Sequence, residues 1–259
     1  MNAGHKFIFV CGLHRSGTSP LFRLLRGHPE ISGFSNTGVA EDEGQHLQTV
    51  FPAAKVYGGP GRFGFAAEAH LTEDSTLISG ENQRRLFAEW SRYWDLNRPC
   101  LMEKSPPNLV RTRFLQALFP ESYFIVISRH PAAVSLATSK WVNSSLDSLV
   151  EHWVHCHRLF EQDRPHLRHV LVIRYEDLIQ ASEPIMRQVY KFLGLTPHSS
   201  TALDPAGNEQ YFNTWTQMLT AETNTSANVR HISKKYEQEV QLWGYSFEDL
   251  RNPLLATHR

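Results

Sequence analysis

Residues 6–25 read KFIFVCGLHRSGTSPLFRLL, and this stretch decides the fold. It begins with a run of aromatic and β-branched residues, which predicts a buried strand. A glycine-bounded turn follows, and the apolar residues after the turn recur at helical spacing. The stretch is therefore expected to form a strand, a loop of the size that holds a phosphate group, and a helix.

The loop differs from an ordinary nucleotide-binding loop at one position. Gly12 and Gly17 are separated by four residues and Ser19 stands at the hydroxyl position, but Thr18 occupies the place of the lysine. The backbone N–H groups at the helix start would still bind an anion. The lysine that reaches β- and γ-phosphates is missing. We therefore expect a ligand with phosphate-like oxygens that is not an ordinary ATP–magnesium complex; a plain glycine turn is the alternative.

The composition limits the class of protein and its partners. The chain has 259 residues, enough to bury a sizeable core, and we expect one domain spanning 1–259. Its 26 basic and 26 acidic side chains give no net field, so neither nucleic acid nor an anionic membrane is an expected partner. The three cysteines are odd in number and widely spaced, which argues against a disulfide framework. The N-terminal apolar run is too short for a signal peptide or anchor, so the expected location is cytoplasmic.

The rest of the chain alternates between predicted strands and helices, without internal repeats. The predicted strands are 100–102, 123–127 and 170–173, and the predicted helices are 83–94, 108–118, 131–141, 146–160, 183–193 and 226–242. Residues 51–80 and 196–225 are expected to be loops; the first either contacts substrate or is a surface excursion. The alternation predicts an α/β fold of the P-loop type, with one doubly wound parallel sheet flanked by helices.

The run RSGTS at residues 15–19, placed directly after a strand, resembles the 5′-phosphosulfate loop of sulfotransferases that use 3′-phosphoadenosine 5′-phosphosulfate (PAPS). The tyrosylprotein and heparan sulfate sulfotransferases are the most similar subgroup, and a soluble bacterial member is expected. The resemblance implies that PAPS is the co-substrate and that no metal is needed. It also implies that the loop residues bind PAPS, namely Arg15, Ser16, Gly17, Thr18 and Ser19.

A second anion site is predicted where Arg129 ends a buried strand just before Pro131 begins a helix. The family has its 3′-phosphate site at this place, formed by such an arginine and a serine eight residues later. Here the eighth position is Ala137, so the hydroxyl is expected from Thr138 or Ser135 instead. The alternative is an arginine in a surface ion pair.

Transfer of a sulfuryl group needs a base for the acceptor proton and donors for the charge on the leaving oxygen. The acids that end at Glu43 resemble the Glu-x-Glu segment before a His or Gln in heparan sulfate sulfotransferases, which implies Glu43 as the base, with Glu41 next. The run EKSP at 103–106 resembles the family's Glu-Lys-Thr/Ser-Pro, which implies that Lys104 and Arg15 stabilise the transferred group. A solvated acidic turn and a solvated lysine are the alternatives.

Two later runs extend the resemblance. The run YEDL at 175–178 is similar to the family's Tyr-Glu-x-Leu, which implies that Tyr175 contacts the nucleotide. The run NVRHISK at 228–234 is similar to a segment of tyrosylprotein sulfotransferases, which implies that Asn228 and Lys234 join the cofactor site. Lys234 on a solvated helix face is the alternative. Thr220 and His14 are weaker candidates for hydrogen-bond donors.

Three other hypotheses come from different classes of protein. His152 and Cys156 are four residues apart on one helical face, but two ligands do not make a zinc site. A P-loop kinase would need the lysine that Thr18 replaces. A binding module that kept the loop without catalysis is the remaining alternative. For an enzyme, a tyrosine in a peptide, a saccharide hydroxyl and a small-molecule alcohol all suit a glutamate base, and these acceptor classes stay open.

Overall fold

The computed structural model describes residues 4–199, 203–221 and 224–252. Its centre is a parallel five-stranded sheet in the order β2-β3-β1-β4-β5. The strands are β1 (Lys6–Cys11), β2 (Ile31–Gly33), β3 (Cys100–Lys104), β4 (Ser122–Ser128) and β5 (Val170–Arg174). The predicted α/β fold with a doubly wound parallel sheet is confirmed.

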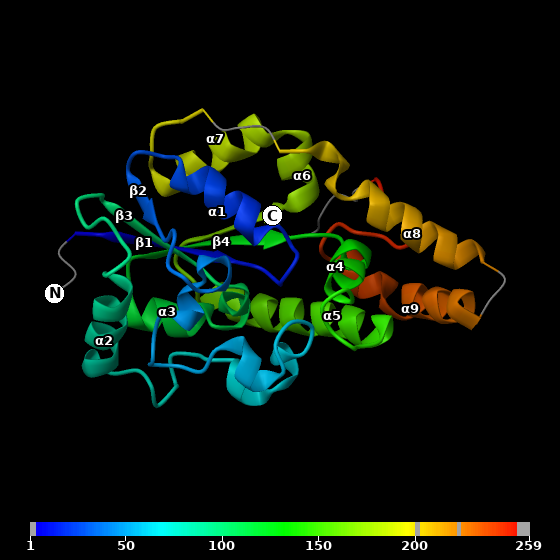
Figure 1. Ribbon diagram of the computed structural model, residues 1–259, viewed down its shortest axis with the longest axis horizontal. Helices are drawn as coiled ribbons and strands as arrows, with labels where there is room; N and C mark the ends of the chain where they lie inside the picture. Colours follow the sequence, from blue (N-terminus) through cyan, green and yellow to red (C-terminus); the bar gives the residue numbers. More distant parts are fainter. Residues whose placement is uncertain (1–3, 200–202, 222–223, 253–259) are drawn as a thin grey trace.

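Helices cover both faces of the sheet (Figure 1). One face carries α1 (Thr18–Arg26), α6 (Tyr175–Gln180) and α7 (Ser182–Leu193), and the other carries α2 (Gly80–Trp90), α3 (Thr112–Leu118) and α5 (Leu146–Asp163). A further group, α4 (Pro131–Thr138), α8 (Glu209–Thr220) and α9 (Asn224–Gln241), lies toward the carboxyl ends of the strands. Because both faces are covered, β1 is buried from Phe7 to Cys11, as expected for a central parallel strand.

The strand register brings the predicted site segments to one edge. Val10 of β1 pairs with Lys104 of β3, and Ser128 of β4 pairs with Arg174 of β5. Since all strands are parallel, the loop after β1, Lys104 and the residues after β4 and β5 meet at the carboxyl edge. Arg129 and Tyr175 therefore follow directly on neighbouring strand ends.

Most predicted elements occur within a few residues of their expected bounds, with four differences. The predicted helix 108–118 is a 3₁₀ turn (Pro106–Val110) followed by α3, because the two prolines begin a turn before the helix. Neither the short strand β2 nor the helix α6 was predicted. The expectation of loops throughout 196–225 is wrong: α8 lies there and buries Tyr211, Phe212 and Trp215 on one face, although its Thr and Asn content favoured a loop.

Two features concern the expected absence of a membrane anchor and of a disulfide framework. No helix within the described ranges is long and apolar enough to cross a bilayer. The thiols of Cys11, Cys100 and Cys156 are buried and unpaired. The segment 51–80, predicted as a loop, contains only short 3₁₀ turns.

Candidate active site

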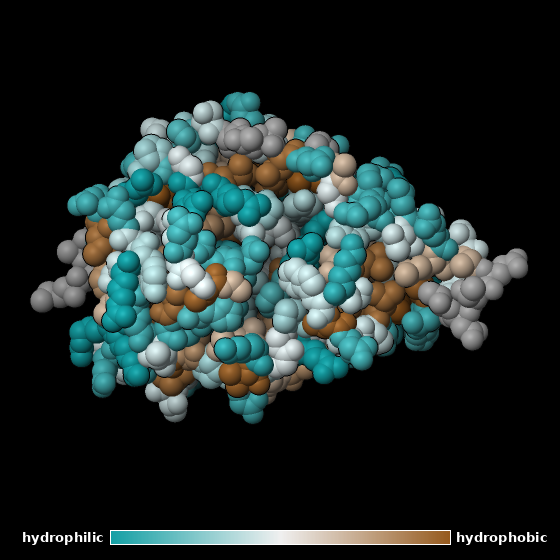
Figure 2. Space-filling model, in the orientation of Figure 1, coloured by the Kyte–Doolittle hydropathy of each residue, from teal (hydrophilic) through white to brown (hydrophobic). Residues whose placement is uncertain are grey.

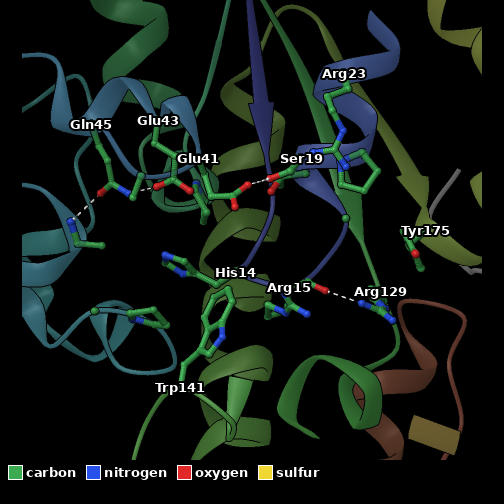
Figure 3. Close-up of a pocket in the computed structure, with 18 of the residues that line it drawn as sticks. His14, Arg15, Ser19, Arg23, Glu41, Glu43, Gln45, Arg129, Trp141 and Tyr175 are labelled. Atoms are coloured by element: carbon green, nitrogen blue, oxygen red, sulfur yellow. Dashed lines mark hydrogen bonds between the residues drawn. The ribbon is translucent and has the colours of Figure 1, made fainter. Parts of the chain in front are cut away.

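A cavity of about 670 Å³ opens at the carboxyl edge of the sheet, beside the start of α1. Figure 2 shows this face hollowed near its middle, where hydrophilic side chains gather. In Figure 3, Glu41, Glu43 and Gln45 lie at one end, Arg129 and Tyr175 lie at the other, and His14 and Arg15 lie between them. The predicted site residues that line the cavity are His14, Arg15, Gly17, Thr18, Ser19, Glu41, Glu43, Arg129 and Tyr175.

The loop between β1 and α1 is shaped to hold an anion. Gly17 caps α1 with a φ of 101°, and a Cβ there would lie 2.3 Å from Tyr175 Cδ2, so only glycine fits. Arg15 also has a left-handed backbone, with a φ of 68°. Such conformations cost free energy and cluster at functional sites. The first N–H groups of α1 have no preceding helical carbonyl to bond, so they are available to an anion.

Lys104 is the last residue of β3, and its ammonium lies beside the start of α1, next to the loop that lacks the usual lysine. Its ammonium donates to the carbonyl oxygen of Glu41 at 2.8 Å and lies 3.4 Å from Ser19 Oγ. It also lies 3.4 Å from Glu43 Oε1. The side chain is only 1% exposed, so its charge is held between the start of α1 and the acidic segment.

Glu43 is the better placed of the two predicted bases. Its carboxylate is buried, accepts a hydrogen bond from Gln45 Nε2 at 2.5 Å, and lies 3.8 Å from His46 Nε2. Glu41 is exposed and accepts a hydrogen bond from Ser19 Oγ at 2.8 Å. Only Glu43 combines burial with a contact to the Lys104 ammonium.

His14 faces the cavity as a neutral imidazole. Burial, followed by the charges of Lys104 and His46, lowers the pKa of His14 to about 3. Its ring packs edge-on against Phe63, with 5.8 Å between ring centroids. At neutral pH this side chain can exchange hydrogen bonds but adds no charge.

Glu103 ties the segment that carries Glu43 to the strand that carries Lys104. Its carboxylate accepts from Gly44 N at 2.9 Å, from Ser105 Oγ at 2.5 Å and from Asn108 Nδ2 at 2.5 Å. A Cβ on Gly44 would lie 2.4 Å from Glu103 Cγ, so the glycine permits the close approach. These three hydrogen bonds hold Glu103 between the two segments.

Titration of Glu103 is expected to make the free energy of unfolding depend on pH. Burial raises the pKa of Glu103 from its ordinary 4.5 to about 7, against the hydrogen bonds from Ser105 and Asn108. The folded state thus binds this proton more tightly than the unfolded chain, so stability falls as pH rises from about 4.5 to about 7, by up to roughly 3 kcal/mol. We expect the Tm of the wild type to fall relative to that of Glu103→Gln across this window. The measurement is thermal denaturation at stepped pH.

The exposed Glu68→Gln provides the matched control, which should follow the wild-type pH profile. Parallel profiles for the wild type and Glu103→Gln would show that the buried carboxylate does not titrate in this range.

Arg129 holds the other end of the cavity. Its Nε donates to Asn208 Oδ1 at 2.7 Å, one terminal nitrogen donates to the carbonyl oxygen of Arg15 at 2.9 Å, and the other donates to that of Gly207 at 2.8 Å. Its guanidinium lies 4.4 Å from the ring centroid of Tyr175. A guanidinium has five N–H donors, so two remain beyond these three bonds.

The structure does not bring every predicted residue to the cavity. Ser16, Lys104 and Thr138 are buried and do not line it. The Lys104 ammonium instead lies behind Ser19 and Glu43, which do line it, and the Ser16 hydroxyl donates to Leu13 O at 2.7 Å. Asn228 and Lys234 are exposed on α9 and are also absent from the lining. Their place in the cofactor site stays a prediction: α9 packs on α5 and α8, and neither side chain lines this cavity.

The weaker candidates, Ser135, Thr220, His152 and Cys156, do not line the cavity. Ser135 is buried with no partner for its hydroxyl among the described residues, and it does not line the cavity. Thr220 lies exposed at the end of α8, where its hydroxyl donates to Thr216 O at 3.1 Å. His152 Nε2 accepts from Gly64 N at 3.1 Å and lies 3.4 Å from Cys156 Sγ. In the described ranges, no group of three or more His, Cys, Asp or Glu side chains is arranged to hold a metal ion.

Several lining residues were not predicted. Gln45 had a signal, because the Glu-x-Glu resemblance includes a following His or Gln. Trp141 stacks on the Arg15 guanidinium at 4.6 Å, and Gly207 and Tyr211 come from the region expected to be loops. Composition and spacing carried no signal for these three.

Known proteins of one family are similar to this chain in sequence pattern and in fold. The model of the sulfotransferase family matches residues 8–199. Sulfotransferase STF9 from Mycobacterium avium is similar in structure, with a TM-score of 0.54 and 13% identity over 96% of this chain and 79% of that one. Sulfotransferase STF1 from Mycobacterium tuberculosis H37Rv has a TM-score of 0.51 and 15% identity over 91% of this chain and 77% of that one.

The sulfotransferase domain from the Synechococcus PCC 7002 olefin synthase has a TM-score of 0.50 and 17% identity, over 91% of this chain and 97% of that one. None of the curated proteins matches the sequence. At these identities the structural likeness concerns the fold alone. The family match extends from β1 to the segment after α7 and includes the anion loop, Glu43, Lys104, Arg129 and Tyr175, so the chain belongs to the sulfotransferase family.

Proposed function

We propose that this sulfotransferase transfers the sulfuryl group of PAPS to a hydroxyl or amine acceptor by in-line displacement. The observation that carries the proposal is the position of Lys104. A buried ammonium lies within 3.4 Å of both Ser19 Oγ and Glu43 Oε1, so the anion loop, a cation and a candidate base meet at one point.

The residues present fit a ligand with two separate anionic groups. The loop from Arg15 to Ser19 and the start of α1 would hold the 5′-phosphosulfate, since they offer N–H groups and a cation. Arg129, at the other end of the cavity, keeps two N–H donors for the 3′-phosphate. Tyr175 lines the wall between Gly17 and Arg129 and would contact the nucleotide.

The reaction requires one bond to form and one to break. PAPS supplies an activated sulfuryl group: the acceptor oxygen or nitrogen bonds to sulfur while the bond from sulfur to the 5′-phosphate oxygen breaks, leaving 3′-phosphoadenosine 5′-phosphate (PAP). Glu43 would take the acceptor proton. Lys104, Arg15 and the loop N–H groups would stabilise the negative charge on the sulfuryl and leaving oxygens. No metal ion is needed when these cations neutralise that charge.

The acceptor enters from the side of Glu43 in this proposal. Gln45 lies at this end beside Glu43, and His14 and Trp141 line the middle of the cavity next to it (Figure 3). A peptide tyrosine, a saccharide and a small-molecule alcohol all remain acceptor hypotheses, and a cytoplasmic location remains a prediction.

Incubation with ³⁵S-labelled PAPS and separate pools of phenols, saccharides and tyrosine peptides tests the proposal. We expect label to appear in one pool and PAP to be released in equal amount. PAP should also raise the Tm in the absence of magnesium. A rise in Tm without labelling of any pool would favour a binding module, and the absence of both would overturn the proposal.

A further inference from the structure

Three cations surround the ring of Tyr211 in α8. The ring centroid lies 5.3 Å from the Arg129 guanidinium and 4.9 Å from the Lys140 ammonium, and the phenol is also close enough to Arg15 for that charge to lower its pKa. The ion pairs of the described residues include none with Arg15, Arg129 or Lys140. Unpaired cations that converge in this way favour an anionic ligand group.

Tyr211 brings a hydroxyl-bearing side chain next to Arg129 and Lys140. It lines the cavity while only 6% of it is exposed. Neither of the hydroxyls expected from α4, those of Ser135 and Thr138, lines the cavity. A phenol with two rotatable bonds, packed in this way, loses little conformational entropy when a ligand binds.

The position of Tyr211 is fixed by the same arginine that ends β4. Arg129 donates to Asn208 Oδ1 and to the carbonyl oxygen of Gly207, directly before α8 begins. Asn208 in turn donates to Glu176 Oε1 at 2.7 Å. Tyr211 lies one helical turn beyond Asn208, so Arg129 and Tyr211 are held as a pair.

The charges around the phenol also make it a stronger donor. Burial raises the pKa of Tyr211, but the interactions with Arg15, Lys140 and Arg129 outweigh burial and lower the pKa below its ordinary value. A more acidic O–H group donates a stronger hydrogen bond to a phosphate oxygen.

We propose that the Tyr211 hydroxyl donates a hydrogen bond to the 3′-phosphate of PAPS and PAP beside Arg129, in place of the serine expected on α4. This inference rests on the proposed function, because it assigns one contact within the proposed nucleotide site. It makes α8 part of the discrimination between nucleotides with and without a 3′-phosphate.

Tyr211→Phe tests the inference through the Kd values of PAP and of AMP, which lacks the 3′-phosphate, measured by calorimetry. The phenyl ring keeps the packing against the three cations, and an unchanged Tm confirms that the variant folds. We expect PAP binding to weaken about 10- to 100-fold, as for a lost hydrogen bond to a charged group, and AMP binding to stay the same. Ser135→Ala and Thr138→Val are the matched controls and should leave both Kd values unchanged.

Each outcome bears on a different statement. If the wild type binds PAP no more tightly than AMP, the proposed use of PAPS fails. If the wild type prefers PAP and Tyr211→Phe keeps that preference, the role of Tyr211 is wrong. Equal weakening of PAP and AMP would assign the hydroxyl to the 5′-phosphate through Arg15 and would also overturn the inference.

Discussion

Replacing Glu43 with glutamine is expected to lower kcat about 10²- to 10⁴-fold, the usual contribution of a positioned general base. Glutamine keeps the shape and can still contact Gln45 and Lys104, but it cannot take the acceptor proton. The Kd of PAP should change little, because Glu43 lies at the opposite end of the cavity from Arg129 (Figure 3). The measurement is steady-state turnover of the acceptor found with labelled PAPS, together with PAP calorimetry.

Glu41→Gln separates the two candidate bases. The exposed Glu41 carboxylate bonds to Ser19 and has no ion pair with Lys104, so this variant should lose far less activity. Full turnover by Glu43→Gln with a large loss in Glu41→Gln would move the base to Glu41. Full turnover by both variants would remove the acidic segment from the mechanism.

The parts of the site that follow strand ends could be predicted from sequence. A strand pattern followed by Lys104 or Arg129 places the cation at the carboxyl edge of a parallel sheet, whatever the rest of the chain does. The absence of a loop lysine was informative for the same reason, since β3 lies beside β1 and delivers Lys104 to the loop.

The contacts that depend on helix packing could not be predicted. Helix α4 is buried all round, so its sequence does not indicate which side chains face the cavity. Asn208 and Tyr211 are about 80 residues from Arg129 in sequence, and their contact is set by the packing of α8 on α4. The resemblance places Lys234 in the cofactor site from a short motif alone, and that motif does not encode how α9 packs; Lys234 is exposed and does not line the cavity.

The largest combined effect is expected from Lys104, because its charge serves both the fold and the reaction. Lys104→Met removes a buried ammonium and leaves the Glu43 carboxylate, whose side chain is 9% exposed, without its cation. Breaking such a pair costs about 3–5 kcal/mol of stability. Loss of a preorganised donor to the developing charge costs a further factor of about 10²–10³ in kcat.

The two effects can be separated by the double variant Lys104→Met/Glu43→Gln. It removes both charges, so its Tm should recover most of the loss seen in Lys104→Met, whereas its turnover should stay at or below that of either single variant. If Lys104→Met turned over at the wild-type rate while still binding PAP, Lys104 would only be the structural partner of Glu43.

Chemical rescue supplies the positive control for Lys104. In Lys104→Cys, alkylation of the new thiol with 2-bromoethylamine rebuilds a side chain of nearly the same length with a terminal ammonium. Reaction in mild denaturant followed by refolding is needed because position 104 is buried, and the wild type carried through the same steps accounts for modification of the buried Cys11, Cys100 and Cys156. We expect the alkylated variant to regain at least about a tenth of the wild-type kcat, against the loss of about 10²–10³ before alkylation. Methionine and unmodified cysteine at position 104 lack the positive charge. If kcat recovers only after alkylation, the ammonium beside Ser19 and Glu43 is what accelerates the reaction.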